Sequence, residues 1–554
     1  MNKEKKICRK AVVLAAGFGT RLRPFTCVTP KPLMPVWGES MISRIVALLR
    51  EAGVEEIVVN CHYLHEQIEV WCQACGCRAQ YEPEILGTGG VLNPLREWIG
   101  EDDFYLVNGD IVVDLPDGLE RLSAAKLGGQ TLAAALVTEE GPRTIEVEPE
   151  SGFVTNWKSD DAGFDGTFTY CGIAKLSAEV LKYVEEKGFS SIIAAYEKAL
   201  WDGKFVKAVV DEEMRWTDAG TIKSYVELNQ DKEDNAFADF PQLAEVCEVA
   251  KPIEFLGSRG SDRVFFRNGD KIVILYDDAK RVENARYAGH AKWLKAHGVS
   301  VPEVLADRPE LKTLVLADAG TEKTLTLRDY VHVIEALAAF NALGEKAAAE
   351  LALEPAFDEN LYEWERDLFA EHCLGTRYHR TMSEAVKSDL EKVAAVLVKE
   401  PKALVHRDFQ STNILWRNEV FTFIDFQGMR LGAAAYDLAS LVYDPYVEGE
   451  IERRALSKVY ARASGREQIV EVLPFAAVQR LVQCLGAYGR LASVGQPQFG
   501  KFVLPALKNL HAAAAEANLK AIAQLAEELI GVEKPDAAHH HHHHHGKCKM
   551  EDVK

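Results

Sequence analysis

The first apolar run of the chain, residues 11–16, has the length and composition of a buried strand. Residues 40–52 carry apolar side chains at helical spacing, and a second short apolar run follows at residues 54–60. Strand, helix and strand in this rhythm predict a doubly wound α/β domain. Residues 104–110 and 205–210 are further apolar runs and predict two more strands of the same sheet.

The pattern changes near residue 245, where a charged segment ends at a proline. Beyond it, residues 264–267 and 271–276 predict a β-hairpin around Asn268-Gly269, and residues 311–317 predict another strand. The rest is strongly helical, and after Pro445 we expect helical core without chemistry of its own. We therefore divide the chain into domains 1–245 and 246–534 and a tail, 535–554, whose histidine run is typical of a purification tag.

Composition narrows the possible partners. The chain has 554 residues and a net charge of −20, from 64 basic and 84 acidic residues, so no basic stripe is available for nucleic acid. No uninterrupted apolar run is long enough to span a bilayer, and the N-terminus lacks a signal peptide. We expect a cytoplasmic protein with reduced thiols that binds neither nucleic acid nor membrane. A faint zinc-like group lacks a second ligand pair, so its thiols are expected to be incidental: Cys61, His62, Cys72, Cys75 and Cys77.

A glycine-rich turn follows the first predicted strand. Gly17 and Gly19 let the backbone turn tightly and come close to a ligand. Cations and a hydroxyl come directly after them, at Thr20, Arg21, Arg23 and Lys31. Backbone amides beside cations suit a polyphosphate, because the amides reach its oxygens and the cations neutralise its charge.

Two carboxylates stand at strand ends in the same half. Asp110 ends the apolar run 104–110, and Asp218 follows the strand predicted at 205–210. Open α/β sheets bind ligands at the carboxyl ends of their strands. Two carboxylates brought together there would repel each other unless a cation lay between them, and Mg²⁺ is suited to that place.

These stretches resemble the signature of the sugar-nucleotide pyrophosphorylases, LAAGxGTRLxPxT followed by PKPLxPV, which residues 14–26 and 30–36 match. The loop 81–91, YEPEILGTGGV, resembles the family's nucleobase loop. The resemblance implies nucleotidyl transfer to a sugar 1-phosphate, with Arg21 and Lys31 as catalytic residues and Asp110 and Asp218 as Mg²⁺ ligands. The nucleotide-binding residues that it implies are Ala15, Gly17, Gly19, Thr20, Glu82, Gly87 and Thr88.

The second half carries a kinase-like pattern. His406-Arg407-Asp408 is followed five positions after the aspartate by Asn413, and Asp425 ends a later apolar run. With residues 436–439, YDLA, this resembles the aminoglycoside phosphotransferase and choline kinase group, in particular its sugar 1-kinases. The resemblance implies an α+β kinase-like domain with a small β-rich lobe and a large helical lobe.

The same resemblance assigns roles in that domain. Asp408 is the base that accepts the proton of the acceptor hydroxyl, and Asn413 and Asp425 hold Mg²⁺. The implied nucleotide-binding residues are Gly260, Ser261, Arg263 and Asp318, and the backbone of residues 317–319 would contact adenine. The usual strand lysine is missing, and either Arg263 or Lys271 is expected to replace it.

Together the halves imply a bifunctional enzyme with ATP and UTP as co-substrates. The kinase would phosphorylate a free sugar at its anomeric hydroxyl, and the transferase would convert the product to a UDP-sugar. The pair resembles the N-acetylmuramate kinase and uridylyltransferase families of peptidoglycan recycling. A choline kinase joined to a phosphocholine cytidylyltransferase is the alternative, and the sugar, the base and the oligomeric state stay open. A scaffold without catalysis is disfavoured, because five clustered catalytic-type groups would serve no ligand.

Overall fold

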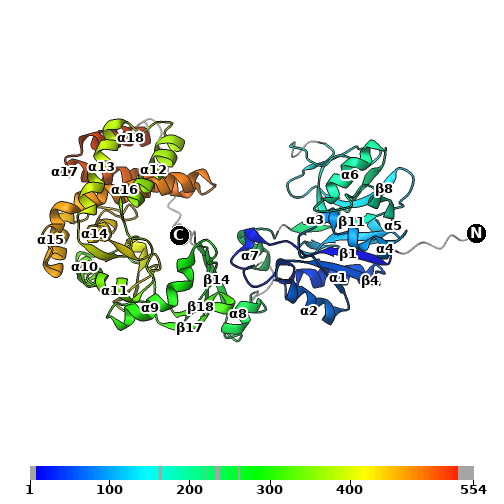
Figure 1. Cartoon of the computed structure of the whole chain (residues 1–554), viewed down its shortest axis with the longest axis horizontal. Helices are drawn as coiled ribbons and strands as arrows, with labels where there is room; N and C mark the ends of the chain where they lie inside the picture. Colours follow the sequence, from blue (N-terminus) through cyan, green and yellow to red (C-terminus); the bar gives the residue numbers. More distant parts are fainter. Residues whose placement is uncertain (1–7, 161–164, 218, 231–236, 260–261, 535–554) are drawn as a thin grey trace, which may run out of the picture.

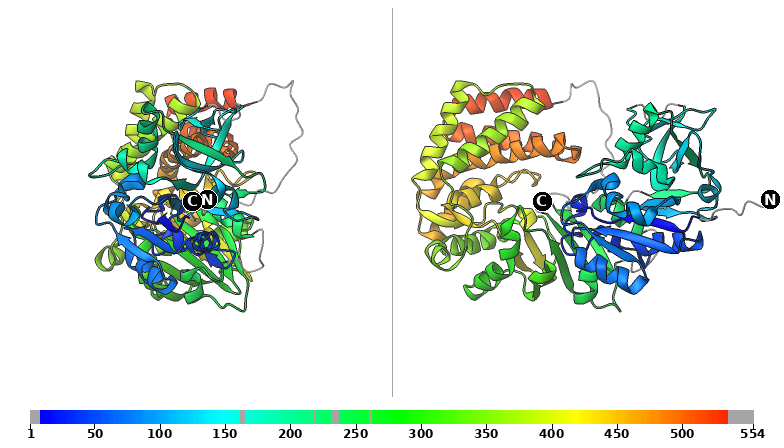
Figure 2. Two further views of the ribbon diagram at one scale, coloured as in Figure 1. Left: turned by 90° about the vertical axis from the view of Figure 1, so that its right-hand side faces the viewer. Right: turned by 45° about the vertical axis from the view of Figure 1, so that its right-hand side comes forward.

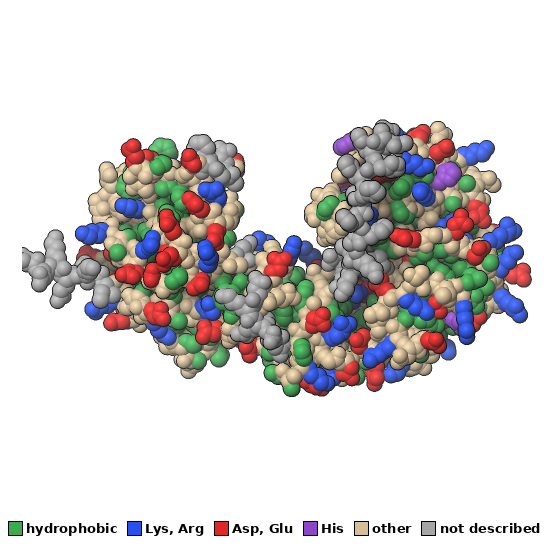
Figure 3. Space-filling model, turned by 180° about the vertical axis from the view of Figure 1, so that it is seen from behind, with side chains coloured by type: hydrophobic (Ala, Val, Ile, Leu, Met, Phe, Trp, Pro, Cys, Tyr) green, Lys and Arg blue, Asp and Glu red, His purple; other side chains and the backbone are tan. Residues whose placement is uncertain are grey.

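The computed structural model of the chain describes residues 8–160, 165–217, 219–230, 237–259 and 262–534. An N-terminal α/β domain and a C-terminal two-lobed domain lie side by side (Figure 1). The helices α7 (Ile222–Gln230) and α8 (Pro241–Val246) lie near the junction. Seen from behind, the lower edge of the molecule is continuous, while a groove separates the upper parts of the two halves (Figure 3).

The N-terminal domain is built on a nine-stranded sheet. Its strands are β1 (Lys10–Leu14), β4 (Glu56–Cys61), β5 (Arg78–Tyr81), β6 (Phe104–Asn108), β8 (Thr131–Thr138), β9 (Ile145–Val147), β10 (Val154–Asn156), β11 (Thr167–Leu176) and β12 (Phe205–Val210). The order β5-β4-β1-β6 is parallel, and β11 then pairs with β6 in the antiparallel sense. The predicted α/β fold is therefore confirmed, although the sheet is mixed.

The helix predicted at residues 40–52 is confirmed within one residue at each end. Ser40 caps α1 (Met41–Glu51), since its hydroxyl accepts a hydrogen bond from the Ser43 N–H at 3.2 Å. The other helices are α2 (His65–Cys75), α3 (Gly87–Gly90), α4 (Arg96–Ile99), α5 (Glu120–Ala124) and α6 (Ile192–Trp201). Two apolar clusters fill the space between the sheet and its helices, because the central strands are buried along nearly their whole length.

The C-terminal domain opens with a small lobe. Its five-stranded antiparallel sheet consists of β14 (Ile253–Arg259), β15 (Arg263–Asn268), β16 (Lys271–Tyr276), β17 (Val304–Arg308) and β18 (Thr313–Ala317), and α9 (Tyr287–Ala296) accompanies it. The predicted hairpin is confirmed, because Asn268 pairs with Lys271 across the turn. The predicted strand at 311–317 begins two residues later, since Leu311 ends a short 3-10 turn.

The large lobe is helical, as predicted. Its helices are α10 (Leu327–Asn341), α11 (Gly344–Glu350), α12 (Glu359–Leu368), α13 (Glu384–Val398), α14 (Ala434–Val442), α15 (Arg453–Ser464), α16 (Ile469–Ser493), α17 (Val503–Glu516) and α18 (Lys520–Glu533). Two short ladders, β19 (Lys402–Val405) with β22 (Arg430–Ala433) and β20 (Ile414–Arg417) with β21 (Val420–Phe423), carry the kinase-like motifs. Of the described helices, α16 alone is long and apolar enough to cross a bilayer, but 78% of its apolar window is buried among its neighbours.

One apolar cluster, which we call the shared core, belongs to both domains. From the N-terminal side it contains Phe25 of the glycine-rich loop, Tyr225 of α7 and Phe240, and from the small lobe Phe266 of β15. The ring of Phe25 lies 5.2 Å from Phe240 and 6.1 Å from Phe266, centre to centre. Figure 1 and the right view of Figure 2 agree that the small lobe, and not the helical lobe, meets the N-terminal domain.

Candidate active sites

The glycine-rich loop after β1 has a rigid base and an open side. Gly19 has a φ of 60°, and a Cβ there would lie 2.9 Å from the Thr26 side chain, so only glycine fits. The Thr26 hydroxyl donates to the Gly19 carbonyl at 2.6 Å, which fixes the turn. A Cβ on Gly17 would meet no described atom within 4 Å, and Thr20 and Arg21 are exposed beside it.

Lys31 and Asp110 meet at the carboxyl end of the sheet. The Lys31 ammonium lies 3.3 Å from an Asp110 oxygen, and these side chains are 14% and 40% exposed. Gly109 allows this approach, because its N–H donates to the Leu14 carbonyl at 2.7 Å and a Cβ would lie 2.8 Å from that oxygen. A cation, a carboxylate and an open backbone turn are thus gathered at one strand edge, where a metal-bound polyphosphate fits.

Asp218 lies outside the described residues, so its predicted role as a metal ligand stays a prediction. The strand before it, β13 (Arg215–Thr217), pairs with β7 (Val112–Asp114), and Thr217 is opposite Val112. Thr217, the last residue described before Asp218, therefore lies opposite a residue that is two positions after Asp110.

The predicted nucleobase loop is held to the rest of the domain by buried hydrogen bonds. Glu82 is buried, and its carboxylate accepts hydrogen bonds from the Asn60 amide at 3.0 Å and the Leu86 N–H at 2.9 Å. The side-chain oxygen of Asn60 in turn accepts a hydrogen bond from the Ala15 N–H at 2.7 Å. Glu82 thus ties the loop to the end of β1, and its contact with a base stays a prediction.

Gly87 and Thr88 pack against the segment that leads into α6. A Cβ on Gly87 would lie 2.4 Å from the Ser190 carbonyl oxygen, and the Thr88 hydroxyl accepts from the Ile192 N–H at 2.8 Å. These contacts explain the residue types without a ligand, so the predicted contacts with a nucleotide stay untested.

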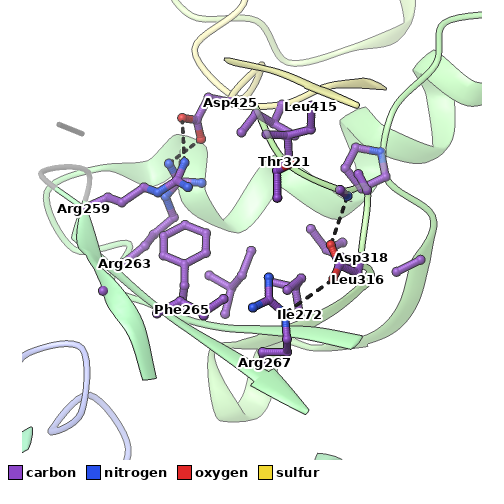
Figure 4. A pocket seen from close by; sticks show the side chains of 18 of the residues that line it. Arg259, Arg263, Phe265, Arg267, Ile272, Leu316, Asp318, Thr321, Leu415 and Asp425 are labelled. Atoms are coloured by element: carbon purple, nitrogen blue, oxygen red, sulfur yellow. Dashed lines mark hydrogen bonds and ion pairs between the residues drawn. The ribbon is translucent and has the colours of Figure 1, made fainter. Parts of the chain in front are cut away.

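In the C-terminal domain, a cavity of about 440 Å³, which we call the small-lobe cavity, lies between the small-lobe sheet and the segment of the large lobe that carries Leu415 and Asp425 (Figure 4). Its floor and walls are apolar, formed by Phe265, Ile272, Leu316 and Leu415. Charged side chains lie at both ends, with Arg259, Arg263 and Asp425 at one end and Arg267 and Asp318 at the other. An apolar slot between polar ends suits a nucleotide, whose base is flat and whose phosphates are charged.

The cation near Asp425 is an arginine. Arg263 Nη2 donates to Asp425 Oδ1 at 2.6 Å, and Arg259 Nη1 lies 3.5 Å from Oδ2. Lys271, the other residue expected to replace the missing lysine, pairs with Glu248 at 3.4 Å and does not line this cavity. Arg263 is therefore the candidate that the geometry favours; Gly260 and Ser261 lie outside the described residues.

Two backbone N–H groups at the far end of the cavity, where contact with adenine is predicted, are engaged within the protein. The Ala317 N–H donates to the Glu303 carbonyl at 2.9 Å, and the Asp318 N–H donates to the Asp270 carbonyl at 3.0 Å. The Asp318 carboxylate accepts from the Gly320 N–H at 3.0 Å and pairs with Arg267 at 3.4 Å. Contact with adenine would therefore fall to the carbonyl groups of this segment or to the N–H of Ala319.

The catalytic-loop motif is held from two sides. Arg480 of α16 donates to Asp408 Oδ1 at 2.7 Å, and the exposed fractions of these side chains are 6% and 41%. The Asn413 amide donates to the Asp408 carbonyl at 2.6 Å. Asp437 of α14 is fully buried, and its oxygens accept from the N–H groups of His406 at 2.8 Å and Arg407 at 3.0 Å. Asp408 thus lies on an anchored loop, with its side chain 41% exposed.

Two of these supporting residues correct the sequence analysis. Arg480 lies after Pro445, in the part that we expected to carry no chemistry, and its signal was an arginine in the apolar middle of a helix. Burial of that charge requires a partner, which Asp408 and the Gln410 amide oxygen at 2.9 Å supply. Asp437 lay inside the YDLA stretch but had no assigned role.

Asp408 and Asp425 open into a larger cleft of about 600 Å³. Arginines outnumber carboxylates along its walls. The arginines are Arg23, Arg259, Arg263, Arg281, Arg407, Arg430 and Arg490, and the carboxylates are Asp262, Glu283, Asp408 and Asp425. Trp364 is the aromatic ring in this lining. The cleft is cationic, although the whole chain is strongly acidic.

Both sites offer oxygen ligands of the kind that Mg²⁺ prefers. At the kinase-like site, Asp425 is buried, and the N–H of the preceding residue, Ile424, donates to the Asn413 carbonyl at 3.0 Å, so Asp425 and Asn413 belong to adjoining segments. At the transferase site, Asp110 is the described carboxylate. Within the described ranges, no group of three or more His, Cys, Asp or Glu side chains has the spacing of a metal cluster, and this includes the cysteines near residue 72.

Comparison with known proteins agrees with this division. Residues 11–200 match the MobA-like NTP transferase domain, and residues 252–471 match the phosphotransferase enzyme family. The N-acetylmuramate alpha-1-phosphate uridylyltransferase of Neisseria meningitidis is 41% identical over 112 residues, which cover 19% of this chain and 48% of that protein. The UTP–glucose-1-phosphate uridylyltransferase of Synechocystis is 27% identical over 241 residues, which cover 39% and 61%. The chain thus spans between about half and three fifths of the length of these curated relatives.

Among solved structures, the inositol-1-phosphate CTP transferase of T. maritima is 19% identical, with a TM-score of 0.35 over 41% of this chain and 96% of that one. UTP-bound UGPase of Acinetobacter baumannii is 18% identical, with a TM-score of 0.33 over 44% of this chain and 100% of that one. The two family matches lie on the two domains described above, one on each. The chain is therefore a fusion of an N-terminal NTP transferase domain with a C-terminal domain of the phosphotransferase enzyme family.

Proposed function

We propose that the chain phosphorylates a free sugar at its anomeric hydroxyl with ATP and then transfers UMP from UTP to the resulting sugar 1-phosphate. The products of the second step are a UDP-sugar and pyrophosphate. The favoured acceptor is N-acetylmuramate, which would place the enzyme in peptidoglycan recycling. Both steps consume nucleoside triphosphates, so we expect it to act in the cytoplasm.

In the kinase step, Asp408 accepts the proton of the acceptor hydroxyl while that oxygen attacks the γ-phosphorus of ATP and ADP leaves. The ion pair with Arg480 supports this role, because it fixes the orientation of the Asp408 carboxylate at the wall of the cleft that Asp408 lines. Arg259 and Arg263 stand where the phosphates would emerge from the small-lobe cavity. Mg²⁺, held by Asp425 and Asn413, would neutralise phosphate charge.

In the transferase step, a phosphate oxygen of the sugar 1-phosphate attacks the α-phosphorus of UTP, and the bond to pyrophosphate breaks. The protein contributes alignment and charge, with no covalent intermediate. Lys31, whose side chain is 14% exposed and lies beside Asp110, would stabilise the negative charge that develops on the reacting phosphate. Arg21 lies on the open side of the glycine-rich turn. Asp110, with the predicted ligand Asp218, would hold a second Mg²⁺.

The single observation that carries the choice of acceptor is the wall of the large cleft, where Arg430 and Arg490 stand in addition to the arginines that pair with Asp277 and Asp425. An acceptor with a carboxylate gains from such a wall, because guanidinium groups bind carboxylates through paired hydrogen bonds. The quaternary ammonium of choline would be repelled, and it requires an aromatic cage that one tryptophan does not make. The alternative of choline kinase with a cytidylyltransferase is therefore disfavoured.

A substrate panel read by mass spectrometry tests the proposal. The protein receives ATP, Mg²⁺ and either UTP, CTP or dTTP, together with N-acetylmuramate, N-acetylglucosamine or choline. N-acetylmuramate and N-acetylglucosamine form a matched pair, since they differ by one carboxylate-bearing ether. We expect UDP-N-acetylmuramate with UTP, and formation of CDP-choline would overturn the proposed acceptor.

Two variants assign the steps to the two sites. Asp408→Asn should abolish phosphorylation of the free sugar and leave uridylyl transfer to supplied sugar 1-phosphate unchanged. Asp110→Asn should do the reverse, so that sugar 1-phosphate accumulates. If a folded variant of either kind lost both activities, two independent sites would be excluded.

A further inference from the structure

Two residues after Arg21, the glycine-rich loop of the transferase domain places Arg23 against the C-terminal domain. Arg23 does not face the transferase site but reaches into the C-terminal domain. Its Nε donates to Asp277 Oδ2 at 2.7 Å and its Nη2 to Asp277 Oδ1 at 2.9 Å. These side chains are 24% and 9% exposed, so the two-pronged pair is largely shielded from water.

Asp277 follows β16 and holds the small lobe's phosphate-side loop. Its backbone N–H donates to the Asp262 carbonyl at 2.9 Å, and its Oδ1 also accepts from the Ala279 N–H at 3.0 Å. The residue after Asp262 is Arg263, which pairs with Asp425. A continuous series of contacts thus runs from the transferase loop to the metal-ligand candidate of the kinase site.

The transferase domain also forms part of the kinase cleft itself. Arg23, Pro24 and Ile222 line the same cleft as Asp408 and Asp425. Leu22 and Phe25, the neighbours of this segment, are 1% and 0% exposed in the shared core. Because both flanks are buried there, the segment cannot move away from the kinase domain without opening the core.

We propose that Arg23 is a positioning residue of the kinase reaction that the transferase domain supplies. It holds Asp277 and, through Asp277, the loop that carries Asp262 and Arg263, so the kinase's nucleotide site is complete only when the two domains are docked. This inference rests on the proposed function, in which the small-lobe cavity binds ATP. It assigns to one residue of the transferase signature a role in the other active site.

Binding of ADP with Mg²⁺, measured by titration calorimetry on the full chain, tests the inference without an acceptor sugar. Arg23→Gln and Asp277→Asn should each weaken that binding by about five- to tenfold, and each should raise the kinase KM for ATP by a similar factor. The double variant should be no weaker than either single variant, because both remove the same contact.

A second pair provides the control. Arg377 and Glu533 form the same two-pronged contact in the large lobe, at 2.9 and 3.1 Å, with side chains 27% and 18% exposed. Arg377→Gln should lower the melting temperature as Arg23→Gln does and leave ADP affinity unchanged. Unchanged ADP affinity in Arg23→Gln and Asp277→Asn would overturn the inference, whereas failure of the unaltered protein to bind ADP would instead overturn the proposed function.

Discussion

At the scale of single residues, the kinase-like site depends on charges that are buried in pairs. Arg480 is enclosed in the large lobe, yet it reaches the one carboxylate that must stay accessible to an acceptor. Arg480, which is 6% exposed, would be costly to bury without a partner, and Asp408, which is 41% exposed, is that partner. The same logic applies to Asp425, which lies between Arg259 and Arg263.

We predict that Arg480→Met destabilises the C-terminal domain by about 1–3 kcal/mol, because it leaves the buried Gln410 amide oxygen without this donor, whereas Asp408 is 41% exposed and stays in contact with water. The kinase kcat should fall by about a hundredfold, as the base loses its orientation. Arg480→Lys keeps the positive charge but loses the paired donors of the guanidinium group. Its stability and its kinase kcat should therefore lie between those of the unaltered protein and those of Arg480→Met. Denaturant unfolding and the kinase assay give both numbers, with uridylyl transfer as the internal control; a normal kinase rate in Arg480→Met would contradict the prediction.

The sequence could indicate Asp408, Asn413 and Asp425 because their spacing is local and therefore legible along the chain. It could not indicate Arg480 or Asp277 as partners, because these residues lie 72 and 254 positions from the residues they contact. Glu82 shows the opposite case. It was predicted from a motif to meet a base, and in the fold its carboxylate is engaged by Asn60 and Leu86.

At the scale of elements, the apolar runs and the one predicted helix, residues 40–52, agree with the observed elements to within about two residues, whereas the helices of the large lobe were predicted only as a helical region. Domain assignment at residue 245 stays a prediction, although β14 begins at Ile253 and α8 ends at Val246. The antiparallel turn of the sheet at β11 was not predictable, since an apolar run carries no sign of its direction. The packing of α3 against the segment before α6 was equally hidden, because glycines at a turn and at a close contact look alike in sequence.

Two glycines make that difference measurable. A Cβ on Gly89 would lie 2.9 Å from the Ser191 carbonyl carbon and oxygen, whereas one on Gly289, exposed in α9, would meet no described atom within 4 Å. We predict that Gly89→Ala destabilises the chain by about 1–3 kcal/mol and slows uridylyl transfer. Gly289→Ala should stabilise it by about 0.5–1 kcal/mol through its higher helix propensity. Chemical denaturation of the two variants measures their free energies of unfolding. Equal changes in the two variants would contradict the prediction, because they would show that the chain shifts to make room for a methyl group at Gly89.

At the scale of the whole molecule, two enzymes of different folds share a core and an ion pair. The apolar contacts dominate the joint, since the aromatic rings of Phe25, Phe237, Phe240 and Phe266 are buried in it. Acidic and basic side chains are interspersed on the face shown in Figure 3, so charge is not gathered into one stripe there. The cationic cleft is a local exception inside an acidic molecule.

The ion pair at this joint should give the fold a defined acid sensitivity. Arg23 lowers the pKa of Asp277 from 3.8 to about 2. A lowered pKa in the folded state stabilises the fold above the unfolded pKa, and that contribution is lost as the pH falls from about 4 toward 2. The melting temperature of the unaltered protein should therefore exceed that of Asp277→Asn at pH 5 to 7, and the gap should narrow below about pH 4. Differential scanning fluorimetry across this range measures it; a constant gap down to pH 3 would contradict the prediction.

Truncation of a shared ring should affect both activities. Phe266 belongs to the kinase small lobe, and Phe266→Ala leaves a cavity against Phe25 and Phe237 at a cost of about 3–5 kcal/mol. We predict that kinase and transferase activities are then lost together on heating, at one lowered temperature. Loss of kinase activity alone, with the transferase as heat-stable as before, would show that the domains unfold separately.

The shared core also constrains how the two halves of such a gene can evolve. Where two joined enzymes fold independently, mutations can erode one while the other persists. Here the rings that support the kinase lobe also support the loop that carries Arg21, so a substitution selected in one half changes how well the other half folds. A lineage that ceased to need either reaction would still have to keep that domain folded in order to retain the other.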